Sequence, residues 1–531
     1  MEFMNIPKVP FTILALAPFC LAPDASVSQK IIPVAIGALD DALAAFGPNI
    51  WIPQPTEICP EGGVTFSPVR MKDITPDGLI RITPYLKDIY DAGEFIEKSV
   101  VSGKFPEEIA GHLKTVWPHL PLDLSLPVQG SQVQRRDVVD DILSMVAVPG
   151  QPVSGTAAGH MGPKAWKNRI DNLLTDLLEN IYNSETFRAF EAAWRGVEAV
   201  VRQGPVREDG PVRLLIAPVS LDTLPAALEA LVPELALDPP NLILIDIPFD
   251  NSPVCMELME KVAIFAETLL APVAIWITPN FFHLKSWGGL KKLPYLRNCL
   301  EDAVYAKWRK LREQAESRWL VVTCNRFLTR TPYGEDIRPR SVFFREKEPL
   351  WIGPVWALGG LAAQSTEIFG WPSRFTDYVK IQLGNLAIEN IAGVEPASTE
   401  VVLPADRLRQ FKEVGIMPLT GAERKDIAFM PQETTAAGES LSLQLFFSRI
   451  TGFLMRCRGR EYQISDGNDL EAHCGAALSA FFRQTGYEPP PDLIVQARQA
   501  NPGEPVPLHI TFTPPRAVLP VSRRIEFTFL W

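Results

Sequence analysis

The sequence lacks the short motifs that identify the commonest classes of enzyme. Its 531 residues contain no phosphate-binding loop of the form G-x-x-x-x-G-K-[ST], no G-x-G-x-x-G after a predicted strand, no G-x-S-x-G and no H-E-x-x-H. The sequence therefore gives no support for four classes of enzyme: P-loop NTPases, dinucleotide-dependent oxidoreductases, α/β-hydrolases and HExxH zinc peptidases. We predict that the protein is not an enzyme and has no catalytic residue, cofactor or bound metal.

Concentrated positive charge is also absent. The chain has 51 lysines and arginines against 62 aspartates and glutamates, which gives a net charge of −11 without any basic stripe. Because nucleic-acid-binding proteins normally carry a basic face, we expect no nucleic-acid partner. No stretch of about 20 uninterrupted apolar residues exists, so we expect no membrane insertion.

Cysteine and histidine are sparse as well. The seven cysteines are scattered, and no two of them form a C-x-x-C pair. An odd number without a framework indicates reduced thiols and a cytoplasmic location. His473 adjoins Cys474, but neighbouring residues on a helix point about 100° apart and cannot easily share a metal ion.

The remaining composition is that of a globular protein. Apolar residues make up 47% and charged residues 21% of the chain, which excludes a mostly disordered protein. The length predicts two to four domains. The 49 prolines are about twice the average share and indicate many turns and strand ends.

Residues 1–125 are predicted to form a small α/β domain. The apolar run Phe11–Ala22 has two interpretations: the core of a secretory signal, or a buried or sheet-adding strand. We favour the strand because Glu2 lies where a signal would be basic and Pro18 interrupts the run. The other expected elements are a helix at 34–45, strands at 49–53 and 63–68, and helices that begin at Pro76 and at Pro84, the second ending near Val101.

The rest of the chain divides into a linker and two further domains. Residues 126–165 are polar and rich in Gly, Pro and Ser, which is typical of a linker. Residues 166–395 begin with two helices at 168–203 and continue as strand, helix, strand, helix, strand, which predicts a parallel α/β layer. Residues 396–531 end in two segments of alternating hydrophobicity, PLHITFTP and RRIEFTFLW, which predict a hairpin or a pair of edge strands.

Three residues allow an enzymatic interpretation. Asp246 follows the apolar run LILI, and Asp250 follows four residues later. Carboxylates at the carboxyl end of a parallel strand are common catalytic or metal-binding groups in α/β enzymes. No partner motif accompanies them, so loop capping is the simpler interpretation. An α/β enzyme that uses Asp246, Asp250 or His283 remains an alternative.

Five segments between residues 165 and 531 resemble the large sheath subunit of type VI secretion systems, called TssC or VipB. The most specific is SRWLVVTCNRFLTRTPYG, residues 317–334, which is similar to S-R-Y-x-x-L-x-x-P-R-F-L-x-R-x-P-Y-G except that Asn325 replaces a proline. The others are residues 181–201, 350–371, 400–420 and 441–454, and Gly353 takes the place of an asparagine. The residues that carry the resemblance are Trp194, Arg195, Gly196, Arg326, Phe327, Pro332, Tyr333, Gly334, Pro354, Trp371, Ser448 and Arg449.

Residues 64–96 resemble the small sheath subunit, TssB or VipA, through Met71–Pro76 and Pro84–Leu86. The chain thus looks like both sheath subunits fused, with the Gly- and Pro-rich segment as the join. The resemblance implies a mixed α/β, multi-domain contractile tail-sheath-like fold in which subunits share β-sheets.

The same resemblance implies a mechanical function. Sheath subunits polymerise as hexameric rings stacked helically around an Hcp-like tube, next to a baseplate, in the cytoplasm, and contract to propel the tube for protein secretion. A ClpV-type ATPase recycles two-chain sheaths through an N-terminal helix of the large subunit. Here residues 129–164 replace that helix, which puts an ATPase partner in doubt.

The resemblance also implies strands that link neighbouring copies, because an added strand satisfies the free backbone groups of a sheet edge. We expect Phe11–Ala17, Leu124–Val128 and Ile525–Leu530 to link copies, with 510–513 as acceptor; pairing within one subunit is the alternative. The helix predicted at 470–484, with Glu471, His473 and Arg483, is a candidate tube-facing element. The linking residues are Phe11, Ile13, Ala15, Leu124, Leu126, Ile510, Phe512, Ile525, Phe527 and Phe529. A phage-tail or baseplate structural protein is a further alternative.

Overall fold

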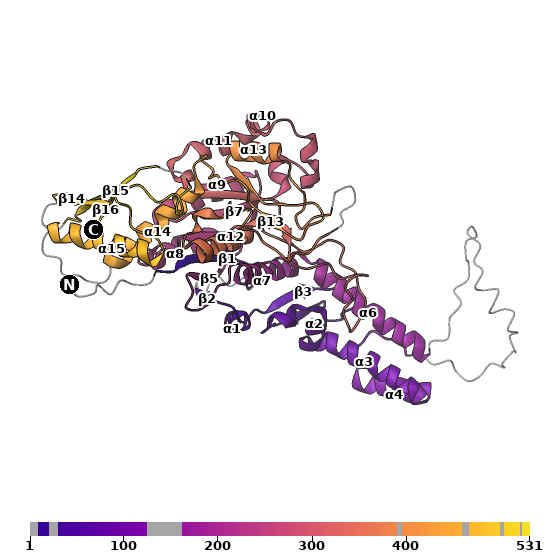
Figure 1. Ribbon diagram of the computed structural model, residues 1–531. Coiled ribbons are helices and arrows are strands. Elements are labelled where there is room, and N and C mark those ends of the chain that lie inside the picture. The colour runs from indigo at the N-terminus through magenta and orange to yellow at the C-terminus, as the bar shows by residue number, and fades with distance from the viewer. Residues whose placement is uncertain are drawn as a thin grey trace, which may run out of the picture.

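The computed structural model describes residues 9–20, 30–124, 162–389, 396–458, 467–499, 504–520 and 523–531. Its centre is a seven-stranded sheet of order β11-β8-β7-β6-β1-β5-β2 (Figure 1), in which every neighbouring pair is parallel except β2 with β5. The prediction of a mixed α/β fold with a parallel layer is confirmed. The strands are β1 (Phe11–Ala17), β2 (Ile32–Val34), β5 (Val212–Pro218), β6 (Leu242–Phe249), β7 (Val273–Ile277), β8 (Leu320–Cys324) and β11 (Ile416–Pro418).

Strand β1 lies in the middle of this sheet. It pairs with β5 on one side and β6 on the other, and all seven of its residues are buried. A strand buried on both faces reads as a continuous apolar run, which explains the sequence FTILALA. The strand interpretation of this run is therefore confirmed. The expected separate domain over residues 1–125 is wrong, because the sheet of the second domain contains this strand.

Helices cover both faces of the sheet, and β1 contributes to both layers. Ile13 belongs to the core cluster shared with α7 (Glu185–Gln203) and α12 (Pro354–Phe369). Leu14 belongs to the cluster on the opposite face, shared with α8 (Leu224–Leu235) and α9 (Pro253–Leu269). Successive strand residues point to opposite faces, so one strand joins the two layers into a single core.

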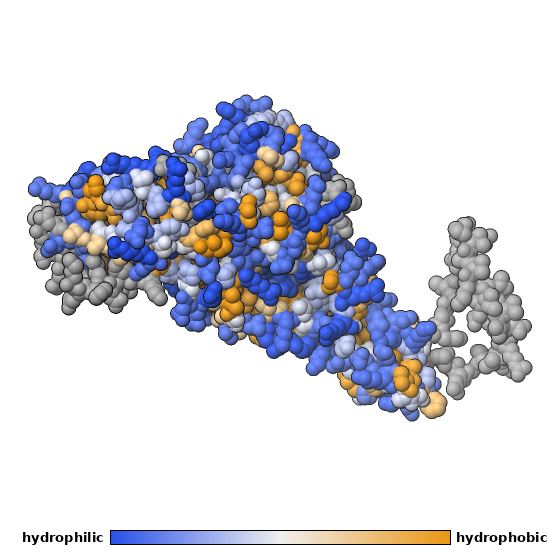
Figure 2. Space-filling view, in the orientation of Figure 1, coloured by the Kyte–Doolittle hydropathy of each residue, from blue (hydrophilic) through white to orange (hydrophobic). Residues whose placement is uncertain are grey.

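An arm of helices extends from this body, to the lower right in Figure 1. It consists of α3 (Pro84–Val101), α4 (Pro106–Val116) and the first part of α6 (Pro163–Asn183). Helix α2 (Pro76–Ile82) begins as predicted, because the side chain of Thr75 accepts a hydrogen bond from the backbone N–H of Gly78. Figure 2 shows apolar residues at the far end of the arm. Val101, the last residue of α3, and Phe105, just before α4, are 85% and 69% exposed.

The C-terminal unit has its own core. It contains α14 (Leu441–Arg458), α15 (Gly467–Gln484) and a small antiparallel sheet of β14 (Ile494–Ala497), β15 (Pro507–Phe512) and β16 (Ile525–Leu530). Its buried cluster also includes Val9 and Trp371. The predicted terminal hairpin is confirmed. The expected boundary at residue 396 is wrong, because β11 pairs in the main sheet with β8.

Most other predicted elements are confirmed, including the two helices over 168–203, the helix from Pro84 to Val101 and the strands at 49–53 and 63–68. The helix expected at 34–45 begins later, because residues 32–34 form β2. The remaining elements are α1 (Leu39–Phe46), β3 (Ile50–Pro53), β4 (Gly63–Phe66), η1 (Met71–Ile74), η2 (Pro279–Phe282), η3 (Trp287–Lys292), α10 (Leu296–Cys299), η4 (Ala303–Tyr305), α11 (Ala306–Glu313), η5 (Ala315–Arg318), β9 (Phe327–Leu328), β10 (Trp351–Ile352), η6 (Pro372–Arg374), α13 (Ala405–Glu413), β12 (Thr420–Gly421) and β13 (Ala428–Phe429).

Candidate assembly site and motif residues

The small C-terminal sheet offers an edge at which another strand can add. Its middle strand, β15, is paired on both sides, with β14 and with β16 of the same chain. Residues Ile510 and Phe512 therefore cannot accept a strand from a neighbour in this arrangement, and that expectation is corrected. The outer sides of β14 and β16 are the two edges of this sheet.

The outer edge of β14 is partly covered. The backbone N–H of Ala497 donates to Glu471 Oε1 of α15 at 2.6 Å. Glu471 was a candidate for contact with a tube, but its carboxylate is used within the chain. Helix α15 also buries Leu470, Cys474 and Phe481 in the C-terminal core.

The outer edge of β16 is more open, and the register shows which groups it presents. Trp531 and Val506 exchange two backbone hydrogen bonds, of 2.9 and 3.1 Å. Because hydrogen-bonded and non-hydrogen-bonded pairs alternate in an antiparallel ladder, the register places Glu526, Thr528 and Leu530 in non-hydrogen-bonded pairs with β15. Their N–H and C=O groups point outward. Arg458 Nη1 donates to the carbonyl of Leu530 at 3.3 Å.

The other two segments predicted to link copies are Phe11–Ala17 and Leu124–Val128. Phe11, Ile13 and Ala15 lie in the central strand β1, where both edges are hydrogen-bonded within the chain. The expectation that β1 reaches into a neighbour is corrected, because its removal from this sheet would leave one side of β5 and one side of β6 unpaired. Leu124 is buried and not in a strand, and residues 125–128, Leu126 among them, lie outside the described residues.

Several motif residues form a buried network of charges. Arg330 donates from two nitrogens to Glu191, at 2.8 and 2.9 Å, and from two to Glu346, at 2.7 Å each. Arg195 also contacts Glu191, at 3.4 Å. Burial alone would raise the pKa of Glu191, but the charges and hydrogen bonds of Arg330 and Arg195 outweigh it and lower that pKa. Tyr333 places its ring under the guanidinium of Arg330, and its backbone N–H donates to Glu346 at 2.7 Å.

This network joins distant parts of the chain. Glu191 lies on α7, whereas Arg330 and Glu346 lie on the segment after β8. Gly196, one turn further along α7, packs so closely against the indole of Trp356 on α12 that a Cβ atom would collide with it. The segment Trp194–Gly196 therefore holds α7 against both the charge network and α12.

The two departures from the sheath pattern each have a structural reason. Asn325 has a φ of 71°, which proline cannot adopt. Its side chain instead bridges Val401 and Leu419, donating to their carbonyls at 2.8 and 2.7 Å. At Gly353, a Cβ atom would collide with the carboxylate of Asp246. A side chain at position 353 and a carboxylate at position 246 therefore exclude one another.

The candidate catalytic residues have structural roles. Asp246 lies inside β6, so its assignment as a loop cap is wrong; Trp356 Nε1 donates to its Oδ2 at 2.6 Å. Burial raises the pKa of Asp246 to about 6, against the hydrogen bond from Trp356 and the charge of Arg326. Asp250 is a cap as expected: it accepts hydrogen bonds from the N–H of Ser252 at 2.9 Å and from Asn280 at 3.0 Å. His283 follows η2 with a φ of 55° and lies against the ring of Tyr305.

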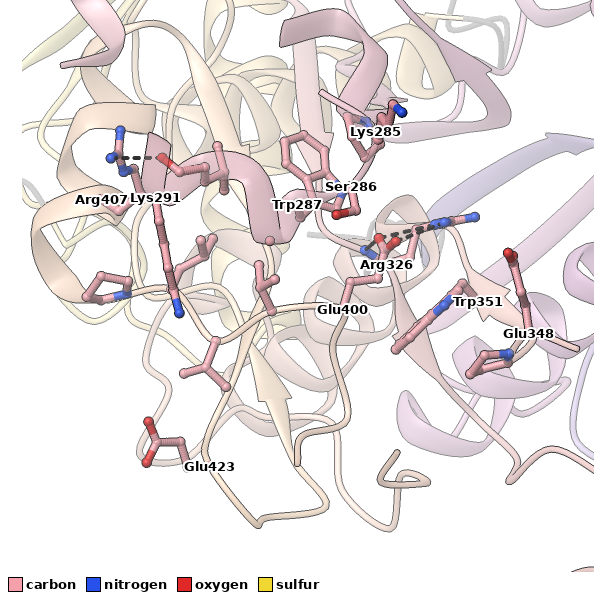
Figure 3. Close-up of a pocket in the computed structure, with 18 residues that line it drawn as sticks. Lys285, Ser286, Trp287, Lys291, Arg326, Glu348, Trp351, Glu400, Arg407 and Glu423 are labelled. Atoms are coloured by element: carbon pink, nitrogen blue, oxygen red, sulfur yellow. Dashed lines mark hydrogen bonds and ion pairs between the residues drawn. The ribbon is translucent and has the colours of Figure 1, made fainter. Parts of the chain in front are cut away.

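A pocket of about 930 Å³ opens beyond the carboxyl ends of β7 and β8 (Figure 3). Arg326 and Glu400 lie in its wall as a bidentate pair, with contacts of 2.8 and 3.2 Å. Arg407, across the pocket, donates to the carbonyl of Leu290 at 3.2 Å. Arg326, Glu400 and Arg407 thus make contacts within the protein, and none of the three candidate catalytic residues lines the pocket.

The described residues contain neither a metal-binding cluster nor a helix suited to a membrane. No group of three or more His, Cys, Asp or Glu side chains in the described part of the chain is arranged to hold a metal ion. None of the described helices is both long enough and apolar enough to cross a membrane.

Comparison with known proteins finds a family whose description matches the central part of the chain. Residues 237–436 match the family described as VipB: EvpB/VC_A0108, tail sheath N-terminal domain. The type VI secretion system sheath protein TssC1 of Pseudomonas aeruginosa is 25% identical over 289 residues, which cover 49% of this chain and 58% of that protein. The central part of the chain is thus similar to type VI secretion sheath proteins. It spans a little over half the length of TssC1.

The family match also relates the motif residues to the sheath domain. Arg326, Phe327, Pro332, Tyr333, Gly334, Pro354 and Trp371 all lie within residues 237–436. A chain in the cryo-EM structure of the anti-feeding prophage baseplate overlays with a TM-score of 0.34 and 9% identity, covering 64% of this chain and 76% of that one. That overlap is too low to assign a function.

Proposed function

We propose that the protein is a structural subunit of a contractile sheath of the type VI secretion kind, and that its output is mechanical. The observation that carries the proposal is the match of residues 237–436 to the VipB tail sheath domain. In the proposed assembly, copies form hexameric rings that stack helically around an Hcp-like tube in the cytoplasm, next to baseplate proteins. Contraction of the stack propels the tube.

Residues 9–124 supply the part that a separate small subunit supplies in two-chain sheaths. The resemblance of residues 64–96 to that subunit supports this role, and so does the packing: β1 lies between β5 and β6, and Tyr182 Oη of α6 donates to the carbonyl of Ile74 at 2.7 Å. An ATPase is not part of the proposal, because the counterpart of its binding helix falls in residues 129–164, of which only 162–164 are described.

The outer edge of β16 is the proposed link between copies. A strand from a neighbour adds there and pairs with the outward N–H and C=O groups of Glu526 and Thr528. Such a link holds two copies together through backbone hydrogen bonds, while the separate cores rearrange between two packings. The C-terminal unit suits this role because it has its own core.

Negative-stain microscopy of the purified protein tests the proposal. A sheath subunit forms hollow tubes, an enzyme forms discrete particles, and a baseplate protein forms closed rings of fixed size. Tubes are the expected result, and discrete particles under all conditions would contradict the function.

A substitution in β16 tests the link itself. Thr528→Pro removes one outward N–H while the hydrogen bonds to β15 are retained, since residue 528 is in a non-hydrogen-bonded pair. We expect folded protein by circular dichroism but a loss of tubes. Thr528→Ala is the matched control and should still form tubes. Normal tubes with Thr528→Pro would show that β16 does not link copies.

A further inference from the structure

A second cavity, of about 1080 Å³, lies between the C-terminal unit and the main body. The end of α12 and the end of α15 form two of its walls, and the loop 208–211 forms a third. Phe369, Phe481 and Tyr487 are among the residues that line it. An apolar group inside the cavity can therefore pack against aromatic side chains, as small organic molecules do in protein pockets of similar size.

One wall of this cavity holds a buried guanidinium without a carboxylate. Arg449 of α14 lines the cavity and is 3% exposed. Its Nη1 donates to the carbonyl of Gly370 at 2.7 Å, whereas its Nε has no hydrogen-bond partner. The guanidinium lies 5.0 Å from the ring centre of Trp371 and 5.7 Å from that of Phe481. In the described part of the chain, no aspartate or glutamate forms an ion pair with Arg449.

The free edge of this guanidinium has the geometry of a carboxylate site. Because Nη1 is bonded to Gly370, the adjacent N–H groups of Nε and Nη2 remain, and these two form the fork that binds both oxygens of a carboxylate. A buried cation without a counter-charge is costly, and one carbonyl and two aromatic rings offset only part of that cost. Burial lowers the pKa of Arg449 to about 9. One negative charge at the fork would offset the remaining cost.

The other charges of the cavity restrict which anion can enter. Glu208 and Asp209 line it and are exposed, and Glu367 lines it while it pairs with Arg207 at 2.6 Å. These three carboxylates repel an anion of two or more charges, such as phosphate at neutral pH, more strongly than an anion of one charge. The lining therefore favours a single carboxylate attached to an apolar body.

We propose that this cavity binds a monocarboxylate with an apolar or aromatic body, and that Arg449 pairs with its carboxylate. The bound molecule contacts α12 of the main body and α15 of the C-terminal unit at once, and so fastens the two together. It adds to the contacts already present at this joint, where Tyr487 Oη donates to the carbonyl of Phe369 at 2.9 Å and Trp371 Nε1 donates to Thr485 Oγ1 at 2.9 Å. The inference does not depend on sheath assembly, since a single chain contains every residue of the site.

A titration of the full chain with phenylacetate, followed by ligand-observed NMR, tests the site. We expect a Kd of about 1 mM or lower, which is ordinary for a ligand of this size. Phenylacetamide has the same shape without the charge and should bind roughly tenfold more weakly, because it lacks the charge-assisted hydrogen bonds. Inorganic phosphate should bind more weakly than phenylacetate. Equal affinities for phenylacetate and phenylacetamide, tighter binding of phosphate, or no binding of phenylacetate below about 10 mM would overturn the proposal.

Two kinds of variant assign the binding to this cavity. Arg449→Gln should abolish the preference for phenylacetate over phenylacetamide. Because Arg449 is buried, the second kind leaves it in place: Ile368 lines the cavity and is 56% exposed. Ile368→Glu should weaken phenylacetate binding by roughly threefold relative to phenylacetamide, and Ile368→Lys should strengthen it by a similar factor, through the added charge.

The matched control is Ile264→Glu, at a position of α9 that is also 56% exposed but is not part of the lining. It should leave the affinity for phenylacetate unchanged. The same affinity in Ile368→Glu and Ile368→Lys would place the ligand elsewhere and overturn the proposal.

Protein concentration distinguishes a small molecule from a carboxylate on a second copy of the chain. The affinity for phenylacetate should not change when the protein concentration is raised by about tenfold, because the proposed ligand competes with no other copy. An affinity that falls as the protein concentration rises would overturn the small-molecule ligand and assign the cavity to a contact between copies.

Discussion

At the scale of single residues, Asp246 gives the chain a pH-dependent stability. Its folded pKa, about 6, is above the ordinary value of 3.8, so the folded state binds this proton more tightly than the unfolded state. The contribution to stability is therefore fully present below about pH 4 and is lost as the pH rises through about 6. At neutral pH Asp246 is a buried carboxylate. An amide could replace it, since the indole N–H of Trp356 needs only an oxygen that accepts its hydrogen bond.

We therefore expect Asp246→Asn to stabilise the protein at pH 8 by about 2–3 kcal/mol and to have almost no effect near pH 4. Urea denaturation at pH 4.5, 6 and 8 measures the difference. Asp377→Asn, a partly exposed acid paired with Arg374 at 3.2 Å, is the control and should show no such increase with pH. A destabilised Asp246→Asn at pH 8 would mean that the charge itself is needed.

The sequence alone identified residues of structural importance where the residue type restricts what can lie beside it, such as an arginine that needs a carboxylate or a glycine that allows close packing. The motif residues Arg195 and Gly196 stood out before their contacts were known, and the structure gives both a role. The pairing of Arg330 with Glu191 was not predictable, because the two residues lie far apart in the sequence. Asp246 was misplaced because strand ends cannot be read from hydrophobicity alone when a strand contains a buried acid.

At the scale of elements, the position of β1 distinguishes a strand of the core from a strand that links copies. Ile13 is fully buried between α7, α12 and the neighbouring strands. Ile13→Ala should lower the free energy of unfolding of the dilute, unassembled protein by about 2–5 kcal/mol. Ile264→Ala, at a 56% exposed position of α9, should change it by less than about 0.5 kcal/mol. Equal stability of both variants would mean that β1 is not part of the isolated subunit's core.

The sequence predicted the type of most elements but not their partners. The alternation of strands and helices between 212 and 277 predicted the parallel layer. Two parallel neighbours need a crossover, usually a helix, that returns the chain to the end of the sheet where the first strand began. Nothing in FTILALA shows which two strands it separates, since any buried parallel strand has that composition. The mistaken domain boundaries at 125 and 396 follow from the same cause: β1 and β11 reach a distant sheet that local patterns do not reveal.

At the scale of the whole molecule, the insertion of β1 between β5 and β6 ties the N-terminal residues to the sheet of the main body. If the chain is a fusion of two subunits, a break within residues 125–161 should be tolerated, since the described contacts between the parts lie elsewhere. Co-expressed fragments 1–140 and 141–531 should purify as one complex, because β1 and the helices of the arm bury large apolar surfaces against the second fragment.

The control for this break is a first fragment that begins at residue 20 and so lacks β1. It retains the packing of α3 on α6 but leaves a gap in the main sheet, in which the backbone groups of β5 and β6 that face β1 are unpaired. We expect little or no soluble complex with it, measured by affinity purification through a tag on the second fragment and by size-exclusion chromatography. Equal recovery of 141–531 with either first fragment would show that β1 does not hold the two parts together, and the fusion would then be two independent domains on one chain.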